Sequence, residues 1–476
     1  MFNISIKALQ ISFVLIVILQ LISVVINWEW INDILISTVM VLPDFSPASR
    51  CLVKRERRLL LCAILILQGS LFLYYLTLAS ATRTINVYNY WHNSSKYQGL
   101  ARPSLFLMKN DQDLEVNKIV RNRRTNGTKD HKCIKKIFNV SFLKVHKAGS
   151  TTVMNIFIRF AINYNLNIVL PRKSNGTGFN YLGRGKTVAR ENVVPILANE
   201  SYNILCNHAV YNREAFHSIL PKDTVYIGII REPVSHFSSA ALYFGFYKHI
   251  RNLFQGKLTA NKVVSYFLKK PLQVKRRLSF VNNRMSFDFG IPKHKFHSDK
   301  FVETYIEDLD QDFSLVLVLE HFQESLVLMK RTLCWDTKDI LYVKLNANKK
   351  TPQFHLDSKD IENLRKWNSA DFILYEHFYK VFVAKVELYG EDFKREVESF
   401  KSIQQDVHTF CNKVVKEGNT TSIFTVSETK WGNGFIITMG DCKLMTESEL
   451  PMMKRLIKNA WSRYHASIAK SQSSYE

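Results

Sequence analysis

The stretch FLKVHKAGSTTVMN, residues 142–155, joins an apolar run to a helical pattern through a short polar turn. Residues 136–145 predict a buried strand, and residues 152–164 predict a helix with one apolar face. A strand that enters a helix through a tight turn presents backbone N–H groups and the positive end of the helix dipole. Lys147 adds a positive charge, and Gly149 lets the backbone approach a ligand closely. The turn therefore predicts an anion site, although an ordinary strand–turn–helix with a Ser/Thr cap has the same pattern.

Three hydroxyl residues follow this glycine, Ser150, Thr151 and Thr152, and each adds a donor for a bound phosphate. A nucleotide triphosphatase carries G-x-x-x-x-G-K-[ST], in which the lysine follows the glycine, whereas here the lysine comes first. The stretch GRGKT at 183–187 ends like such a loop. It has Asn180 in place of the first glycine and no long apolar strand before it, so we interpret it as unrelated to phosphate binding.

A second candidate anion site follows another apolar run. Residues 224–230 predict a buried strand that delivers Arg231 at its end, and Ser239 lies eight residues further on in a helical pattern. An arginine at a strand exit and a serine on the next helix can hold a phosphate together. The arginine alone is weakly specific. With the first turn it indicates a ligand that carries two phosphate groups.

Short apolar runs alternate with helical patterns from Cys133 onward. Further strands are predicted at 313–320 and 434–440, and further helices at 321–333 and at 358–390, which ends near a glycine. This alternation predicts an α/β fold with a central, mainly parallel sheet covered by helices on both faces.

Two apolar stretches precede this region. Residues 59–79 carry no charge, are long enough to cross about 30 Å of hydrocarbon and follow the basic cluster KRERR at 54–58. The positive-inside rule then predicts a type II signal anchor with the bulk of the chain in the lumen. The earlier run, 8–27, fits a second span, a membrane-embedded hairpin or an extension from an uncertain start site. The predicted parts are an N-terminal cytoplasmic extension (1–58), the anchor, a luminal stem (80–132), a catalytic domain (133–405) and a C-terminal extension of unknown role (406–476).

The overall charge favours anionic partners, because the net charge is +24. The chain has no C2H2 spacing and no RNP-type aromatic run, so a nucleic acid is a poor candidate. Six N-x-[ST] sequons after residue 80 agree with a luminal setting. The five cysteines in that part permit disulfides and leave one thiol over, and none of their spacings resembles a zinc site. We expect no metal.

The two anion motifs together resemble those of sulfotransferases that use 3′-phosphoadenylyl sulfate (PAPS). HKAGSTT matches the phosphosulfate loop of these enzymes, and REP at 231–233 with Ser239 matches their 3′-phosphate motif. The chain is most similar to the galactose 3-O-sulfotransferases through NILCNHAVYNREAF (203–216), LEHFQESLVLMKRTLCW (319–335) and LRKWNSADFILYEHF (364–378). The resemblance covers roughly residues 135–400.

The resemblance implies a P-loop-like sulfotransferase fold with an N-terminal transmembrane helix in the Golgi membrane. It implies transfer of a sulfuryl group from PAPS to the 3-hydroxyl of a terminal galactose on a galactosylceramide-like glycolipid or a glycoprotein glycan. Lys147 would neutralise charge on the leaving oxygen. The remaining donor-binding residues would hold the 5′-phosphate (Ala148, Gly149, Ser150, Thr151, Thr152) and the 3′-phosphate (Arg231, Ser239).

His208 is the candidate general base for the acceptor hydroxyl, because related carbohydrate sulfotransferases carry a histidine in a similar context upstream of the R-[DE]-P motif. By position alone the sequence favours a structural histidine bonded to backbone, and only the resemblance favours the general base. His146 and His236 are predicted to be packing or polar-shell residues. The block NNRMSFDFG, 282–290, predicts either a wall of the acceptor cleft, with Arg284 reaching a sugar, or a turn with buried phenylalanines.

Three alternative functions stay open from the sequence. The first is a PAPS-dependent enzyme for another sugar or position, since the motifs concern the donor only. The second is an inactive glycan-binding protein, against which the intact set of Lys147, His208, Arg231 and Ser239 argues. The third is a nucleotide-dependent kinase, which the order of lysine and glycine disfavours.

Overall fold

The computed structural model describes residue 133 and residues 135–172, 181–183, 186–253, 259–271, 280–343, 355–418 and 420–473. The predicted anchor at 59–79, the earlier apolar run and the stem lie outside these residues. Within the described ranges, no helix is both long enough and apolar enough to cross a bilayer.

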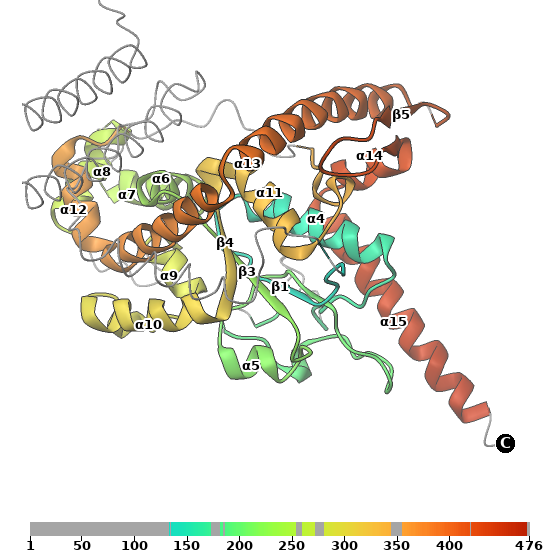
Figure 1. The fold of residues 1–476 in the computed structure, drawn as a ribbon. Helices are drawn as coiled ribbons and strands as arrows, with labels where there is room; N and C mark the ends of the chain where they lie inside the picture. Colours follow the sequence, from blue (N-terminus) through green and yellow to red (C-terminus); the bar gives the residue numbers. More distant parts are fainter. Residues whose placement is uncertain are drawn as a thin grey trace, which may run out of the picture. The chain divides into compact units, whose positions relative to one another are not determined.

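A parallel sheet of four strands forms the centre of the described region (Figure 1). The strands stand in the spatial order β2-β1-β3-β4, and their bounds are β1 (Val140–Phe142), β2 (Ile204–Leu205), β3 (Val225–Ile230) and β4 (Phe313–Val318). Successive residues of β1 and β3 point to opposite faces and nearly all are buried, so both faces of the sheet are covered. The predicted α/β class with a mainly parallel sheet is confirmed.

The chain leaves neighbouring strands of this sheet in opposite directions. It passes from β1 through α4 (Ser150–Asn163) to β2 on one side, and from β3 to β4 on the other. The strand order therefore reverses between β1 and β3, and ligands of such sheets bind outside the carboxyl ends of the strands at a point of this kind. Both predicted anion motifs follow these two strands.

Helices make up most of the remaining described chain (Figure 1). Their bounds are α5 (Arg213–His217), α6 (Pro233–Tyr243), α7 (Phe246–Leu253), α8 (Ala260–Lys269), α9 (Arg284–Asp288), α10 (Asp299–Asp312), α11 (Phe322–Leu333), α12 (Ser358–Trp367), α13 (Ser369–Glu417), α14 (Met439–Thr446) and α15 (Glu449–Ser473).

The prediction of one helix over 358–390 is wrong in its bounds. This helix is interrupted at Asn368, which separates α12 from α13 and whose side chain donates to the Val281 carbonyl at 3.0 Å. At the other end, Gly390 has a non-helical backbone (φ 63°), yet the chain resumes as a helix and continues to Glu417. Residue 405, the predicted end of the catalytic domain, thus lies inside α13.

The C-terminal part begins with a small antiparallel hairpin of β5 (Ile423–Val426) and β6 (Phe435–Thr438), the latter matching the strand predicted at 434–440. The Cys411–Cys442 disulfide joins α13 to α14. A second disulfide, Cys133–Cys334, ties the start of the described region to the end of α11. Cys206 is a buried free thiol, so the predicted leftover cysteine is confirmed.

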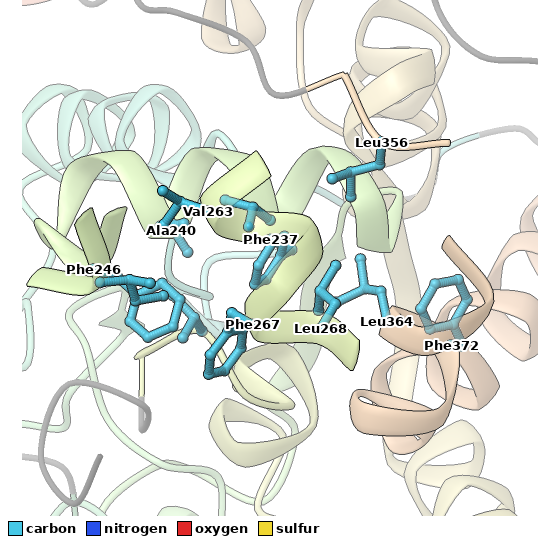
Figure 2. Packing of buried hydrophobic residues seen from close by; sticks show 13 residues of the cluster. Phe237, Ala240, Phe246, Val263, Phe267, Leu268, Leu356, Leu364 and Phe372 are labelled. Carbon is cyan, nitrogen blue, oxygen red and sulfur yellow. The ribbon is translucent and has the colours of Figure 1, made fainter. Parts of the chain in front are cut away.

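A cluster of apolar side chains fixes the position of α6, the helix that follows Arg231 (Figure 2). Phe237 and Ala240 of α6 pack in this cluster with Phe246 of α7, Phe267 of α8 and Leu364 of α12, and all five are at most 1% exposed. Burying aromatic side chains this completely stabilises each by roughly 1.5–3 kcal/mol. The start of α6 is therefore held rigidly at the edge of the sheet.

Candidate functional site

The carboxyl ends of all four parallel strands bring candidate residues to one edge of the sheet. The loop His146–Gly149, here called the Lys147 loop, follows β1, and His208 follows β2. Arg231 directly follows β3, and Glu320 follows β4. This shared edge is a consequence of parallel pairing, because every strand then ends on the same side. The sequence-predicted residues are thus gathered at the point where the strand order reverses.

The Lys147 loop has a strained backbone that ends at the first turn of α4. Lys147 (φ 60°) and Gly149 (φ 72°) both have left-handed conformations. Gly149 is the N-cap residue and provides no side-chain cap. The Thr152 N–H donates to the Gly149 carbonyl at 3.2 Å, and the N–H groups of Ser150 and Thr151 precede this first backbone bond of the helix. Such a turn is suited to an anion.

Gly149 is required for two separate reasons: its positive φ, and its contact with Leu319, whose Cδ1 would lie 2.5 Å from an added Cβ. We expect Gly149→Ala to lower the free energy of unfolding by about 2–4 kcal/mol in urea titrations, from strain plus overpacking. Gly418→Ala is the matched control, because Gly418 has φ +69° and nothing within 4 Å of its added Cβ. It should cost about 1 kcal/mol. Equal losses in the two variants would contradict the contact with Leu319.

Two of the three predicted hydroxyl donors are engaged within the protein. The Ser150 hydroxyl donates to the Val145 carbonyl at 2.6 Å, and the Thr151 hydroxyl donates to Glu449 Oε2 at 3.3 Å. Thr152 lies in the first turn of α4 and is half-buried. The backbone N–H groups of this turn are therefore the main donors that the loop offers to an anion, with the Ala148 side chain fully buried beneath it.

Two cations meet at the loop. Arg231 Nη1 donates to the Lys147 carbonyl at 3.0 Å, and the buried Nε of Arg231 has no hydrogen-bond partner among the described residues. Lys147 Nζ lies 3.7 Å from the centre of the Tyr243 ring. Burial, together with the charge of Arg231, lowers the pKa of Lys147 to about 8. Two partly desolvated cations this close favour an anionic ligand between them.

The two residues that follow Arg231 in the REP motif start helix α6. Pro233 is the first residue of α6, and Glu232 caps the helix by accepting from the backbone N–H groups of Val234 (2.9 Å) and Ser235 (2.7 Å). Proline at the first position and a carboxylate at the N-cap both favour a helix start. The carboxylate of Glu232 is therefore occupied by the helix that orients Arg231.

Ser239 lies on the face of α6 that turns toward the Lys147 loop. His236 and Tyr243 are three and four residues away from it on the same helical face. His236 Nε2 lies 2.8 Å from the His146 carbonyl, and Tyr243 contacts Lys147. The structure therefore brings Ser239 to the same edge as Arg231.

His208 is held in a form that can accept a proton. Its Nδ1 lies 2.8 Å from the Lys144 carbonyl, which can only accept, so Nδ1 carries the hydrogen and Nε2 is left with a lone pair. Burial first, and then the neighbouring charges of His146 and Lys144, hold the pKa of His208 well below its ordinary value. A neutral imidazole of fixed tautomer is the form that a general base requires.

A buried ionic network next to His208 was not identified from the sequence as a unit. His146 stacks on His208 with ring centres 3.8 Å apart, and its Nδ1 lies 2.8 Å from Asp288. Arg284 pairs with Asp288 at 2.8 Å and is only 5% exposed, so its side chain is part of this network. The Tyr181 hydroxyl lies 3.1 Å from His146 Nε2. Asp288 lies in the stretch NNRMSFDFG at 282–290, but nothing in the sequence pattern indicates its contact with His146.

The buried histidines make stability depend on pH. Burial lowers the pKa of His236 from 6.5 to about 3, so the folded protein keeps it neutral while the unfolded chain takes up a proton below pH 6.5. This contribution is complete above pH 6.5 and is lost as the pH falls, by about 1.4 kcal/mol for each unit down to pH 3. Urea titrations at pH 7.5 and 5.5 should show that the free energy of unfolding falls less between these two pH values for His236→Gln than for the wild type. The exposed His217→Gln should behave like the wild type, and identical losses in all three would contradict the prediction.

Within the described ranges, no three His, Cys, Asp or Glu side chains gather as they would around a metal ion.

Comparison with known proteins gives one consistent family. The sequence profile of galactose-3-O-sulfotransferase matches residues 65–427. Human galactosylceramide sulfotransferase is 32% identical over 278 residues, which cover 57% of this chain and 64% of the relative. Mouse galactose-3-O-sulfotransferase 2 is 30% identical over 297 residues (60% and 73%), and mouse galactose-3-O-sulfotransferase 3 is 31% identical over 280 residues (57% and 63%). The chain thus spans roughly two thirds of the length of these relatives, and α14 and α15 lie beyond the profile match.

Proposed function

Because this chain belongs to the galactose-3-O-sulfotransferase family, we propose that it transfers a sulfuryl group from PAPS to the 3-hydroxyl of a terminal galactose. The observation that carries the proposal is the meeting of Lys147, Arg231 and His208 at one edge of the sheet. Two cations for a donor and one neutral base for an acceptor are what such a transfer requires.

The residues present fit a bisphosphate donor. The uncapped first turn of α4 would hold the 5′-phosphate, helped by Thr152. Arg231, whose buried Nε lacks a partner in the described chain, would hold the 3′-phosphate with Ser239. A strand, a tight turn and a helix that grip a phosphate are also the basis for assigning a P-loop-like sulfotransferase fold to this sheet.

Charge stabilisation and proton removal are assigned to different residues. Sulfuryl transfer, like phosphoryl transfer, depends mainly on positioning and electrostatics. As the acceptor oxygen bonds to sulfur and the bond from sulfur to the phosphate oxygen breaks, Lys147 neutralises the charge left on that oxygen. His208 Nε2 takes the hydroxyl proton. Its Nδ1–H bond to the Lys144 carbonyl keeps Nε2 as the acceptor.

We further propose a galactosylceramide-like glycolipid or a glycoprotein glycan as the acceptor, at the Golgi membrane. The apolar run at 59–79 supports a type II anchor, with the C-terminal bulk in the lumen. The Cys133–Cys334 and Cys411–Cys442 disulfides support an oxidising compartment. A membrane anchor would keep the site close to lipid-borne sugars.

The test is transfer of labelled sulfate from PAPS by the full chain, purified in detergent. The acceptors are galactosylceramide, lactosylceramide, N-acetyllactosamine and a heparan precursor. We expect label on the galactosides and none on the heparan precursor. Label on the heparan precursor alone would support a sulfotransferase for another sugar. Binding of glycans without any transfer would support the inactive glycan-binding alternative.

A further inference from the structure

The C-terminal helices, which lie beyond the family match, touch the residues around the Lys147 loop. Figure 1 shows α14 and α15 (red) beside α4 (teal), and α14 packs against α4. Asn155 of α4 donates to the Leu444 carbonyl at 3.0 Å. Glu449, the first residue of α15, reaches further toward the site.

The two carboxylate oxygens of Glu449 have different partners. Oε1 accepts from Lys144 Nζ at 2.6 Å, and Oε2 accepts from the Thr151 hydroxyl at 3.3 Å. Lys144 is 1% exposed, and a buried ammonium requires a counter-charge. The backbone carbonyl of Lys144 in turn accepts from His208 Nδ1. One carboxylate is thus connected to the first turn of α4 and to the chain segment that orients His208.

The segment that carries Glu449 is itself held in place. The Cys411–Cys442 disulfide fixes α14, and Met452 and Met453 of α15 are at most 1% exposed. Further along α15, Arg463 donates to Asn167 Oδ1 at 3.0 Å. Glu449 is therefore a fixed group.

We propose that Glu449 is a positioning residue of the donor site, which makes the C-terminal extension a working part of the enzyme. The inference rests on the proposed function, in which the first turn of α4 holds the 5′-phosphate. Glu449 fixes the Thr151 side chain at that turn and neutralises Lys144, so that the chain from Lys144 to Thr151 keeps one conformation. Donor binding then does not have to order this turn, which lowers the free-energy cost of binding.

The first experiment compares Glu449→Gln with Glu447→Gln in the full chain. Glu447 is the matched control, because it lies two residues away and pairs with Arg455. Titration calorimetry with adenosine 3′,5′-bisphosphate should show a Kd about 10-fold higher for Glu449→Gln and less than about 2-fold higher for Glu447→Gln. The KM for PAPS should rise by a similar factor, and kcat should change less. An unchanged or lower Kd for Glu449→Gln would overturn the positioning role.

Two further variants separate positioning from stability. The Lys144→Met/Glu449→Leu pair removes both charges while keeping apolar volume, so its Tm should recover relative to Glu449→Gln. If Glu449 acts through Thr151, the bisphosphate Kd of this pair stays raised; recovery of both properties would overturn the proposal. In a Thr151→Val background, Glu449→Gln should raise the Kd by a smaller factor than in the wild-type background, because the bond to Thr151 is already absent and only the pairing with Lys144 is lost. An undiminished effect there would overturn it too.

Hydrogen exchange on the ligand-free protein distinguishes failure of the inference from failure of the proposed function. Glu449→Gln should raise amide exchange over residues 144–152, and Glu447→Gln should not. Unchanged exchange would overturn the positioning role even if the wild type binds the bisphosphate. A wild-type chain that does not bind the bisphosphate would overturn both the proposed function and the donor-site role of Glu449.

Discussion

Lys147→Ala should lower kcat/KM for sulfuryl transfer by about 10³-fold, which corresponds to about 4 kcal/mol of lost transition-state stabilisation. The reason is that Lys147 and Arg231 are the cations that the Lys147 loop brings together, and Arg231 is held by its bond to the Lys147 carbonyl. That bond uses the backbone of residue 147 and survives the substitution. The loss should therefore fall mainly on kcat, while the Kd for adenosine 3′,5′-bisphosphate rises by about 10-fold.

Lys186→Ala is the control for this variant. Lys186 belongs to GRGKT, the stretch that resembles a nucleotide-binding loop, and its side chain is exposed. Its removal should leave kcat/KM within about 2-fold of the wild type, since exposed side chains contribute little. A large loss of kcat/KM with Lys186→Ala and a small loss with Lys147→Ala would contradict our assignment, because the donor would then bind at GRGKT.

His208→Gln should lower kcat by about 10²- to 10⁴-fold and leave the KM for PAPS within about 3-fold. Glutamine can still donate to the Lys144 carbonyl, so it keeps the structural bond of His208 and removes only the basic nitrogen. The two interpretations of this histidine therefore give opposite results. A purely structural histidine predicts near wild-type kcat in the glutamine variant.

The pH profile adds a second readout for His208. Because its pKa lies well below the ordinary value, His208 stays neutral in mildly acidic solution, and wild-type kcat should not fall near pH 6.5. A fall in kcat centred near pH 6.5 would indicate an exposed histidine as the base. His217→Gln, on the exposed end of α5, should reproduce the wild-type rate and profile.

Local patterns predicted the part of the fold that lies close to the donor site. The apolar runs at 224–230 and 313–320 became β3 and β4, because strands buried on both faces read as continuous apolar segments. Gly149 was identified from its place between a strand and a helix, and its left-handed φ supplies the physical reason. Arg231 was identified because a strand exit is visible in the sequence.

Contacts between distant segments could not be predicted in this way. The interruption at Asn368 depends on a bond to Val281, which leaves no trace in the periodicity of 358–390. Asp288 reaches His146 across 142 residues, and Glu449 reaches Thr151 across 298. A carboxylate on a polar helix end looks like any solvated charge until its partner is known. These tertiary contacts decide how the site is held together.

The Cys133–Cys334 disulfide would have a mechanical consequence under the membrane anchoring proposed above. Any tension that arrives along the chain before Cys133 can pass through the sulfur bridge directly into the end of α11. The bonds from Ile137 N–H to the Leu333 carbonyl (3.0 Å) and from Trp335 Nε1 to the Ile137 carbonyl (2.8 Å) reinforce this junction. The load then bypasses β1, which begins only at Val140. With such an anchor, we expect a pull on the N-terminal chain to act on the end of α11 before it acts on β1 and the Lys147 loop.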